Sequence, residues 1–390
     1  MPFYHKLGRI PSKRHITFYK KDGKSLYREE LFGTRGFSGI YSNKYHIHIP
    51  SGAKAIRKVT GHLIEKWPEA PLQWYLFHTD RKQLPGDFAR SRMLYLFNAH
   101  CAISTSTPNK KSDIFYKNAY AHELIFVHRG KGALHSEFGR LTFGHGDFLI
   151  IPKGVMYRMD FDKYENNKLF ILESDTPFDI PKHFRNEYGQ LLEDAPYCER
   201  DFRPPEFVGP IDQRGEYNVW IKAGERLFEH VWDHHPFDVV GWDGFEYPFA
   251  FNIKEYAPKV GKIHLPPPVH LVFTTIHFVV CNFVPRLFDF HPQAIPAPYY
   301  HSNVDSDEVL YYVDGNFMSR KGIEEGSVTL HPAGIPHGPQ PGKTEESIGA
   351  NETNEYAVMV DTFSPLSLTK NVLETIEIKY PQSWLLNDEE

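Results

Sequence analysis

Two segments near the C-terminus, EVLYYVDG at Glu308–Gly315 and GSVTLHPAGIPH at Gly326–His337, decide the expected fold. An earlier part of the chain repeats their spacing, with ELIFVHRG at Glu123–Gly130 and GDFLIIPKGVMY at Gly146–Tyr157. In both copies six residues separate a glutamate from a glycine, and five residues separate a second glycine from a Pro-x-Gly turn. Two matching spacings in the same order indicate an internal repeat.

Each copy has the pattern of a strand that ends at a glycine, followed by a second strand that ends at a Pro-x-Gly turn. The 30 prolines and the 15% aromatic content are also typical of many short strands joined by turns. We therefore expect an all-β or mostly β chain with two barrels. The expected domains are residues 1–210, a barrel plus a proline-rich connector, and residues 211–390, a second barrel with a C-terminal tail. Short helices are predicted near residues 183–192 and in the last 25 residues.

Composition narrows the range of ligands. The net charge is −5 and no long run of lysine and arginine occurs, so neither nucleic acid nor an anionic membrane is the expected partner. A small ligand is favoured instead. Three scattered cysteines, Cys101, Cys198 and Cys281, form neither a disulfide framework nor a Cys-x-x-Cys metal site, which favours a reducing compartment. No apolar leader or membrane-spanning run is evident, so a cytoplasmic location is expected.

The repeated pattern resembles the two signature motifs of the cupin superfamily, small jelly-roll barrels that often hold a metal ion. In the C-terminal copy the resemblance covers His301, Asn303, Glu308, Gly315, Gly326, Pro332, Gly334 and His337. Asn303 stands where many cupins have a second histidine. In the N-terminal copy Tyr157 replaces the last histidine, and no histidine lies within 116–119. The resemblance therefore implies a degenerate N-terminal jelly roll without a metal and a metal-binding C-terminal one.

A carboxylate at the head of an apolar strand needs a partner, because an unpaired buried charge is costly. Glu308 heads such a strand, and His301 and His337 complete a set of two histidines and one carboxylate. Non-haem Fe(II) oxygenases commonly use this set, which leaves positions open for substrate and dioxygen. We predict that these three residues bind Fe(II). Asp307 is the alternative carboxylate, since neighbouring strand residues face opposite sides of a sheet.

Three further blocks are similar to those of the homogentisate 1,2-dioxygenase family: DVVGWDG at Asp238–Gly244, PYYHSN at Pro298–Asn303 and HPAGIPHGP at His331–Pro339. The resemblance is specific from about Asp238 to Gly342. It implies a ring-cleaving enzyme of tyrosine and phenylalanine catabolism, which converts homogentisate (2,5-dihydroxyphenylacetate) and O2 to maleylacetoacetate. It also implies trimers that pair into hexamers.

The same resemblance assigns roles to individual residues. It places the metal ligands on His301, Glu308 and His337. It places the catalytic acid-base histidine on His264 of the segment GKIHLPPPVH, with His270 as the alternative. An unperturbed imidazole pKa near 6.5 suits the acceptance of a phenolic proton at cellular pH.

The expected substrate-binding residues are His331, His337 and Phe317. His331 would lie beside the ligands and hold water or a substrate oxygen. Phe317 stands where better-known members have a tyrosine, so one hydroxyl available to the substrate is missing. Arg286 is a candidate for binding the substrate carboxylate. The chain also lacks the family's arginine shortly before the PYYH block and has one extra residue between His301 and Glu308.

Three other functions are alternatives to this one. A related cupin dioxygenase that acts on gentisate or 3-hydroxyanthranilate is one, and a non-catalytic two-barrel binding protein is another. A metal-dependent isomerase is a third.

Overall fold

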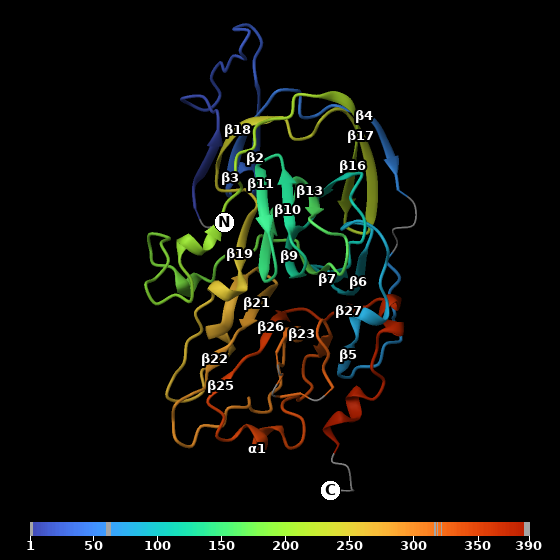
Figure 1. Cartoon of the computed structure of the whole chain (residues 1–390), viewed down its shortest axis with the longest axis vertical. Coiled ribbons are helices and arrows are strands. Elements are labelled where there is room, and N and C mark those ends of the chain that lie inside the picture. Colours follow the sequence, from blue (N-terminus) through green and yellow to red (C-terminus); the bar gives the residue numbers. More distant parts are fainter. Residues whose placement is uncertain (1–2, 60–63, 316, 318, 321, 386–390) are drawn as a thin grey trace.

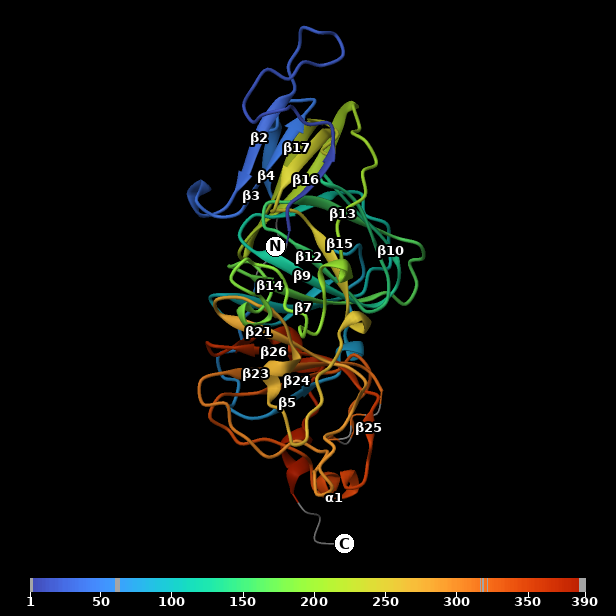
Figure 2. The ribbon, with the colours of Figure 1, turned by 90° about the vertical axis from the view of Figure 1, so that its left-hand side faces the viewer.

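The computed structural model of the chain describes residues 3–59, 64–315, 317, 319–320 and 322–385. Strands dominate it, which confirms the mostly β prediction. Figures 1 and 2 show an elongated molecule with two β-rich lobes stacked along its long axis, the N-terminal lobe above and the C-terminal lobe below. In the described part of the chain, no helix has the length and apolar character needed to cross a membrane.

The N-terminal lobe contains three sheets. The first has the order β15 (Phe202–Arg203), β19 (Phe249–Asn252), β12 (Asp147–Ile151), β9 (His122–Arg129), β14 (Lys168–Ser174), β7 (Cys101–Ser106), β6 (Arg92–Phe97) and β27 (Ser367–Leu368). The second has the order β11 (Gly139–Phe143), β10 (Gly132–Ser136), β13 (Met156–Phe161), β8 (Phe115–Asn118), β16 (Arg214–Ala223), β17 (Arg226–His234) and β4 (Ala53–Lys58). The third has the order β1 (His5–Gly8), β18 (Val239–Gly244), β3 (Tyr41–His46) and β2 (Arg28–Gly33).

The C-terminal lobe is built on one sheet with the order β20 (Leu271–Thr274), β21 (Phe278–Phe283), β26 (Tyr356–Thr362), β23 (Asp307–Asp314), β24 (Val328–His331) and β5 (Tyr75–Phe77). A two-stranded sheet of β22 (Arg286–Leu287) and β25 (Glu352–Thr353) lies in the same lobe. The one α-helix of the described residues is α1 (Lys343–Ser347), and short 3-10 turns occur at η1 (Arg35–Phe37), η2 (Thr79–Arg81), η3 (Lys182–Phe184), η4 (Glu199–Asp201), η5 (Ile253–Glu255), η6 (Pro267–His270), η7 (Lys370–Glu374) and η8 (Tyr380–Trp384).

Strand pairing does not divide the chain at residue 210, where the sequence analysis placed a boundary. Strands β16 to β19 follow that residue but pair within the N-terminal sheets. Conversely, β5 from the N-terminal half pairs with β24, and β27 from the C-terminal half pairs with β6. The proline-rich connector suggested a boundary because it lacks periodicity, but the chain after it returns to the first lobe.

The predicted short helices are reduced to 3-10 turns. In the connector, η3 covers only Lys182–Phe184, and the following residues form a turn in which Gly189 has a φ of 79°. Near the C-terminus η7 and η8 replace the expected helix. The end of the predicted C-terminal tail, residues 386–390, lies outside the described residues.

A continuous hydrophobic core joins the two lobes. Phe170 of β14 stacks on Tyr311 of β23, with ring centroids 4.4 Å apart. The Tyr311 hydroxyl lies 2.6 Å from Nδ1 of His128, which is on β9. One face of the C-terminal sheet therefore packs on the N-terminal lobe.

The other face of the same sheet is open to a cavity. Along β23, Val309, Tyr311 and Val313 belong to the core, whereas Glu308, Leu310 and Tyr312 line the cavity. Strand β26 shows the same alternation, with Ala357, Met359 and Asp361 lining the cavity. Successive strand residues point to opposite faces, so this period of two places the carboxylate at the head of β23 in the cavity wall.

Candidate metal centre and its cavity

The structure brings His301, Glu308 and His337 together at the start of β23. Their ligand atoms lie within 4.8 Å of one another. Glu308 Oε2 is 3.6 Å from His301 Nε2, and Glu308 Oε1 is 3.3 Å from His337 Nε2. Two backbone hydrogen bonds, of 2.8 and 2.9 Å, pair His301 with His337 and fix the two histidines opposite each other.

Both imidazoles are oriented with Nε2 facing the carboxylate. His301 Nδ1 donates to the Tyr299 carbonyl at 3.2 Å, and His337 Nδ1 donates to the Ile335 carbonyl at 3.1 Å. Because Nδ1 carries the proton in each ring, Nε2 has a free lone pair. His337 Nε2 is buried and makes no hydrogen bond within the described part of the chain. Buried polar atoms are rarely left unpaired, so a divalent cation between the two histidines and Glu308 fits this donor set.

His331 lies beside Glu308, as the sequence analysis expected, but it does not face the cavity. Its ring is fully buried behind the carboxylate, with Nδ1 2.7 Å from Glu308 Oε1 and Nε2 3.2 Å from the Tyr380 hydroxyl. It is not among the residues that line the cavity, so contact with a substrate oxygen does not fit its position. His331 instead orients Glu308.

The electrostatics of the cluster suit a cation. Burial alone would raise the pKa of Glu308, but the surrounding imidazoles of His301, His331 and His337 hold that pKa well below its ordinary value. Burial lowers the pKa of His331 to about 4, so this ring is neutral at pH 7. The nearby carboxylate of Glu308 raises the pKa of His301. One anionic carboxylate with neutral imidazoles is the protonation state that a metal site requires.

Asp307, the alternative carboxylate, points away from the cluster. Its Oδ1 accepts a hydrogen bond from the Ala333 amide at 2.8 Å, and its Oδ2 accepts one from the Leu366 amide at 2.7 Å. Asp307 therefore holds two loops in place through hydrogen bonds to their backbone amides.

A cavity of about 460 Å³ lies over the cluster. His301, Asn303 and Glu308 contribute polar atoms to its wall, and Phe283, Phe288, Tyr299, Tyr312 and Phe317 contribute rings. Ligand pockets typically combine an apolar wall with a few converging polar groups at this volume. Phe317, predicted to bind substrate, thus lies in the wall, where its ring contacts that of Tyr312 with centroids 4.7 Å apart.

Both candidates for the acid-base residue line this cavity. His264 is about one-third exposed, and its Nδ1 lies 3.9 Å from Asp289 Oδ2. Burial lowers the pKa of His264, while Asp289 opposes that shift. His270 is buried, and burial lowers its pKa to about 4. Such a low pKa makes His270 the weaker proton acceptor near pH 7.

Three residues that the sequence analysis did not single out belong to this region. Arg320 lines the cavity and is 9% exposed, and its Nη1 donates to the carbonyls of Gly338 at 2.5 Å and Ser319 at 3.2 Å. Asp361 also lines it, and Tyr380 holds His331 from behind. Burial, helped by the charge of Glu308, raises the pKa of Asp361 to about 7. Of the three, Asp361 had a sequence signal, because it interrupts the apolar run YAVMV as Glu308 heads its own.

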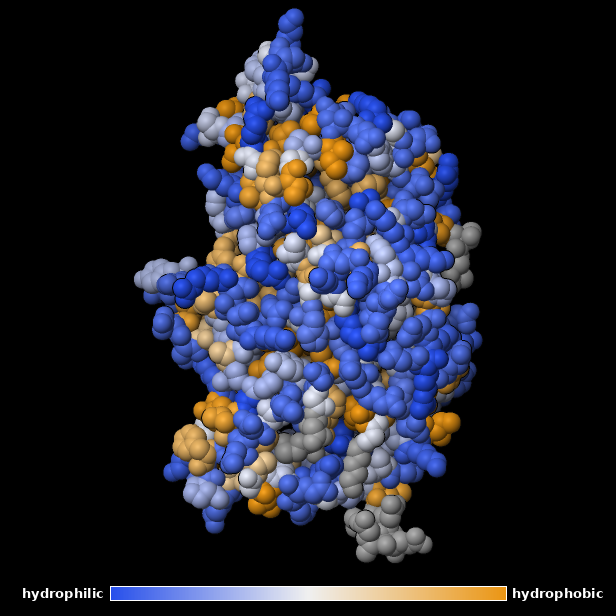
Figure 3. All heavy atoms as spheres, viewed as in Figure 1, coloured by the Kyte–Doolittle hydropathy of each residue, from blue (hydrophilic) through white to orange (hydrophobic). Residues whose placement is uncertain are grey.

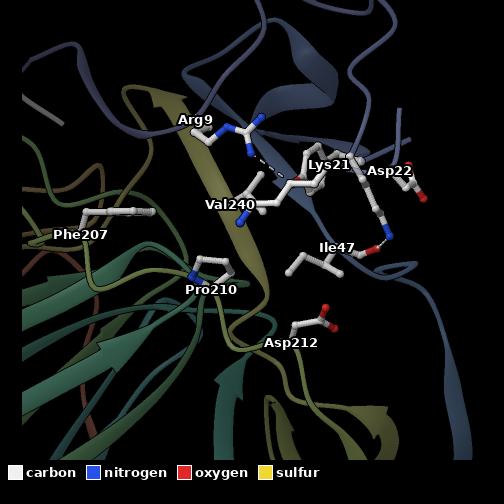
Figure 4. Close-up of a pocket in the computed structure, with 10 residues that line it drawn as sticks. Arg9, Lys21, Asp22, Ile47, Phe207, Pro210, Asp212 and Val240 are labelled. Atoms are coloured by element: carbon white, nitrogen blue, oxygen red, sulfur yellow. Dashed lines mark hydrogen bonds between the residues drawn. The ribbon is translucent and has the colours of Figure 1, made fainter. Parts of the chain in front are cut away.

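A second cavity of about 460 Å³ lies at the far end of the N-terminal lobe (Figure 4). Arg9, Lys21, Asp22 and Asp212 are among its lining residues, and no histidine is. Arg9 Nη1 is 3.4 Å from the Tyr27 hydroxyl, and Lys20 Nζ donates to the Ile47 carbonyl at 2.7 Å. This mixture of charges does not converge on one point as the C-terminal cluster does.

The N-terminal lobe has a different arrangement at the repeated motif. Arg92 of β6 donates to Glu123 and, at 2.8 Å, to the Tyr157 hydroxyl, which in turn donates to Glu123 Oε2 at 2.8 Å. A guanidinium thus occupies the place beside the repeated glutamate. The absence of a metal from this lobe stays a prediction.

A mostly β chain with a two-histidine, one-carboxylate cluster in a sheet-lined cavity defines a β protein with a candidate metal site. Solved cupin-type structures resemble it only distantly. A cupin 2 conserved barrel protein from Leptotrichia buccalis is 14% identical over 70% of this chain and 88% of its own, with a TM-score of 0.32. Bacillus subtilis oxalate decarboxylase is 11% identical over 77% of this chain and 79% of its own, with a TM-score of 0.35.

Sequence relatives identify the family. A family model described as "Homogentisate 1,2-dioxygenase N-terminal" matches residues 96–253. A Saccharolobus solfataricus protein named "Putative dioxygenase SSO1533" is 41% identical over 98% of this chain and 99% of its own length. Homogentisate 1,2-dioxygenases of Oryza sativa and Bradyrhizobium diazoefficiens are 28% and 24% identical, over 67% and 69% of this chain and only 57% and 58% of their own lengths. The chain belongs to the homogentisate 1,2-dioxygenase family.

Proposed function

We propose that the protein is an Fe(II)-dependent dioxygenase that opens the ring of homogentisate to give maleylacetoacetate, with both oxygen atoms of O2 entering the product. The observation that carries the proposal is the buried, unpartnered Nε2 of His337 facing Glu308 and His301 beneath a cavity walled by aromatic rings. In this proposal His301, Glu308 and His337 hold the iron. Bound Fe(II) would supply Lewis acidity toward a phenolic hydroxyl and the redox chemistry that dioxygen needs.

His264 is the proposed proton acceptor for that hydroxyl. It lines the cavity, and Asp289 lies near its Nδ1, so the opposite nitrogen can face the substrate. The wall formed by Phe283, Phe288 and Phe317 would pack on the faces of an aromatic ring and exclude water. In the His264→Gln variant we expect iron and substrate binding to be retained while turnover falls by about 10²–10⁴-fold. His270→Gln should retain turnover, and the reverse result would transfer the role to His270.

Arg286 is the proposed partner of the substrate carboxylate. It lines the cavity, and among the described residues its guanidinium donates a hydrogen bond only to the Leu287 carbonyl, from Nη1 at 3.4 Å. Burial lowers the pKa of its guanidinium, and no carboxylate of a described residue lies within 4.0 Å of it. An anionic substrate would supply the missing partner. Arg286→Met should therefore raise KM for the acid by about 10-fold or more but leave KM for its methyl ester unchanged.

The test of the proposed reaction is anaerobic reconstitution of the purified chain with Fe(II), followed by oxygen uptake with a panel of aromatic acids. Uptake with homogentisate, with one O2 consumed per substrate and none without iron, is expected. Uptake only with gentisate or 3-hydroxyanthranilate would assign the chain to a related cupin dioxygenase. Turnover without oxygen would indicate an isomerase, and the absence of any bound metal would favour a binding protein.

We further propose that the protein works in the cytoplasm as a homo-oligomer, a trimer or hexamer. Large apolar side chains are exposed on the N-terminal lobe, including Phe37, Ile49 and Ile56. Figure 3 shows hydrophobic residues gathered toward the upper end of an otherwise mostly hydrophilic face. Sedimentation of the full chain tests this, and a monomer at micromolar concentration would contradict it.

A further inference from the structure

A second cluster of metal-ligating side chains lies at the seam between the two lobes. His100 Nδ1 is 2.9 Å from Asp175 Oδ2, and His277 Nε2 is 3.6 Å from the same oxygen. The two imidazoles lie face to face, with ring centroids 3.6 Å apart and planes 12° apart. The three side chains thus offer two nitrogens and one oxygen within 4.8 Å of one another.

The three residues come from turns that the backbone holds in place. His100 lies in the turn between β6 and β7, where its amide donates to Asn98 Oδ1 at 2.8 Å. Asp175 follows β14, and its amide donates to the His100 carbonyl at 3.0 Å. His277 lies in the turn between β20 and β21, where its carbonyl accepts from the Phe363 amide at 2.9 Å. Two ligands therefore belong to the N-terminal lobe and one to the C-terminal lobe.

The carboxylate has an unused acceptor. Asp175 Oδ1 is buried and has no hydrogen-bond partner among the residues that the structure describes. Lys153 is close, but its Nζ donates at 2.8 Å to the backbone carbonyl of Asp175 and not to the side chain. Among the described residues, only the two histidines form ion pairs with this carboxylate. Oδ2 of this carboxylate faces both imidazoles while Oδ1 has acceptor capacity left, so the group can take part in binding a cation.

We propose that His100, Asp175 and His277 bind a divalent transition-metal ion, with Zn²⁺ the expected one, and that this ion links the two lobes. Two imidazoles and one carboxylate suit Zn²⁺, Co²⁺ or Ni²⁺ and do not suit Mg²⁺ or Ca²⁺, which prefer oxygen ligands. The side chains are 32%, 38% and 29% exposed, so water can fill the remaining position. On binding, the rings rotate out of their stack so that both nitrogens face the ion. This site is separate from the proposed iron site and does not depend on the proposed reaction.

The experiment measures Zn²⁺ binding by the full, tag-free chain in which the iron cluster has been disabled by Glu308→Ala and His337→Ala. Equilibrium dialysis against Zn²⁺ should give one ion per chain, and Co²⁺ should give the visible absorption of a site with nitrogen ligands. Adding His277→Gln or Asp175→Asn should weaken Zn²⁺ binding by about 10²-fold or more. His183→Gln removes an exposed histidine outside the cluster and should leave binding unchanged.

Thermal unfolding gives a second measurement. An ion that binds only the folded chain stabilises it in proportion to the logarithm of its concentration over Kd. Zn²⁺ should therefore raise the Tm of the iron-site variant, and His277→Gln should abolish the shift. A stoichiometry below one Zn²⁺ per chain would overturn the proposal. Zn²⁺ binding that persists in the His100→Gln/His277→Gln double variant would also overturn it. The cluster would then be a hydrogen-bonded His-Asp-His group without a metal.

Discussion

The two lobes place a pair of carboxylates at the same point of the repeated motif but neutralise them in different ways. In the C-terminal lobe Glu308 of β23 is paired across the ladder with Asp361 of β26. In the N-terminal lobe Glu123 of β9 is paired across the ladder with Glu173 of β14. The backbone arrangement is thus repeated down to the position of the second acid.

The difference lies in the cations. Arg92 bonds to Glu123 and lies 3.7 Å from Glu173, and Lys222 also donates to Glu173. Two anions therefore meet two permanent cations, and burial is compensated within the chain. Among the described residues no lysine or arginine nitrogen lies within 4.0 Å of Glu308 or Asp361, and three imidazoles surround Glu308 instead. The same architecture thus neutralises its buried carboxylates with arginine and lysine in the N-terminal lobe, whereas in the C-terminal lobe it surrounds Glu308 with histidines and provides no such cation in the part that the structure describes.

The largest expected effect is on metal binding. Glu308→Ala should reduce iron affinity by well over the roughly 10²-fold typical of losing a supporting residue, and oxygen uptake should fall with it, because the anionic ligand is gone. Glu123→Ala should leave iron content unchanged. Metal analysis of both purified variants checks the pair. Equal iron loss in the two would show that the lobes do not differ as described.

Arg92→Met should destabilise the protein by about 3–5 kcal/mol, because two buried carboxylates lose their shared cation. Denaturant unfolding measures this change. The Arg92→Met/Glu123→Met double variant should recover part of the stability, since it removes the carboxylate of Glu123, which would otherwise be left buried without its cation. If the single variant is as stable as the wild type, Arg92 is not the cation that neutralises Glu123 and Glu173.

The Asp361→Asn variant tests, through the pH dependence of stability, whether the second carboxylate of the C-terminal lobe lacks a neutralising cation. Burial raises the pKa of Asp361 to about 7, so the folded chain keeps a proton that the unfolded chain releases near pH 4. A raised acid pKa destabilises the fold as pH increases from about 4 to 7, and the effect is complete above 7. In the metal-free protein Asp361→Asn should therefore increase stability by about 2–4 kcal/mol at pH 8 and have no effect at pH 4.

Glu173→Gln is the matched control for that variant. Lys222 and Arg92 hold the pKa of Glu173 below its ordinary value despite burial, so the charged form is the favoured one. Glu173→Gln should therefore lower stability at pH 8. A stabilising effect there would contradict the comparison between the lobes.

The smallest expected effect concerns His331. His331→Phe removes the hydrogen bond to Glu308 Oε1 but keeps a buried ring, so iron affinity should fall by about 10–100-fold while the ligands stay in place. Iron titration followed by oxygen uptake measures it. Ile151 of β12 faces Glu123 at the corresponding ladder position, so its replacement by valine should leave iron binding unchanged.

The spacing of the motif residues predicted that His301, Glu308 and His337 lie together, because a strand fixes the face of the sheet to which each residue points. The period of two placed Glu308 in the cavity wall and Asp307 on the opposite side, where the structure has them. The paired glycine and Pro-x-Gly turns located the strands of both copies, since only a few residues tolerate those backbone angles.

Contacts between distant segments were not predictable in the same way. Arg320 lies in a stretch with no sustained strand alternation after Gly315, so its approach to the cavity left no periodic signal. Tyr380 reaches His331 from 49 residues away, and nothing in the local sequence marks that pairing. The sequence analysis expected His331 beside the ligands and in contact with water or a substrate oxygen, whereas a histidine paired across the ladder with Glu308 is held behind the carboxylate.

The exchange of edge strands between the lobes governs how the chain can be assembled. Strand β5 is made early but completes the C-terminal sheet, and β27 is made late but closes the edge of an N-terminal sheet. During synthesis the first lobe therefore keeps an unpaired edge until nearly the whole chain has left the ribosome, and such edges invite pairing with other molecules. A gene cut near residue 210 would leave the β6 edge unpaired in the first fragment and the β24 edge unpaired in the second, so we expect neither fragment to fold independently.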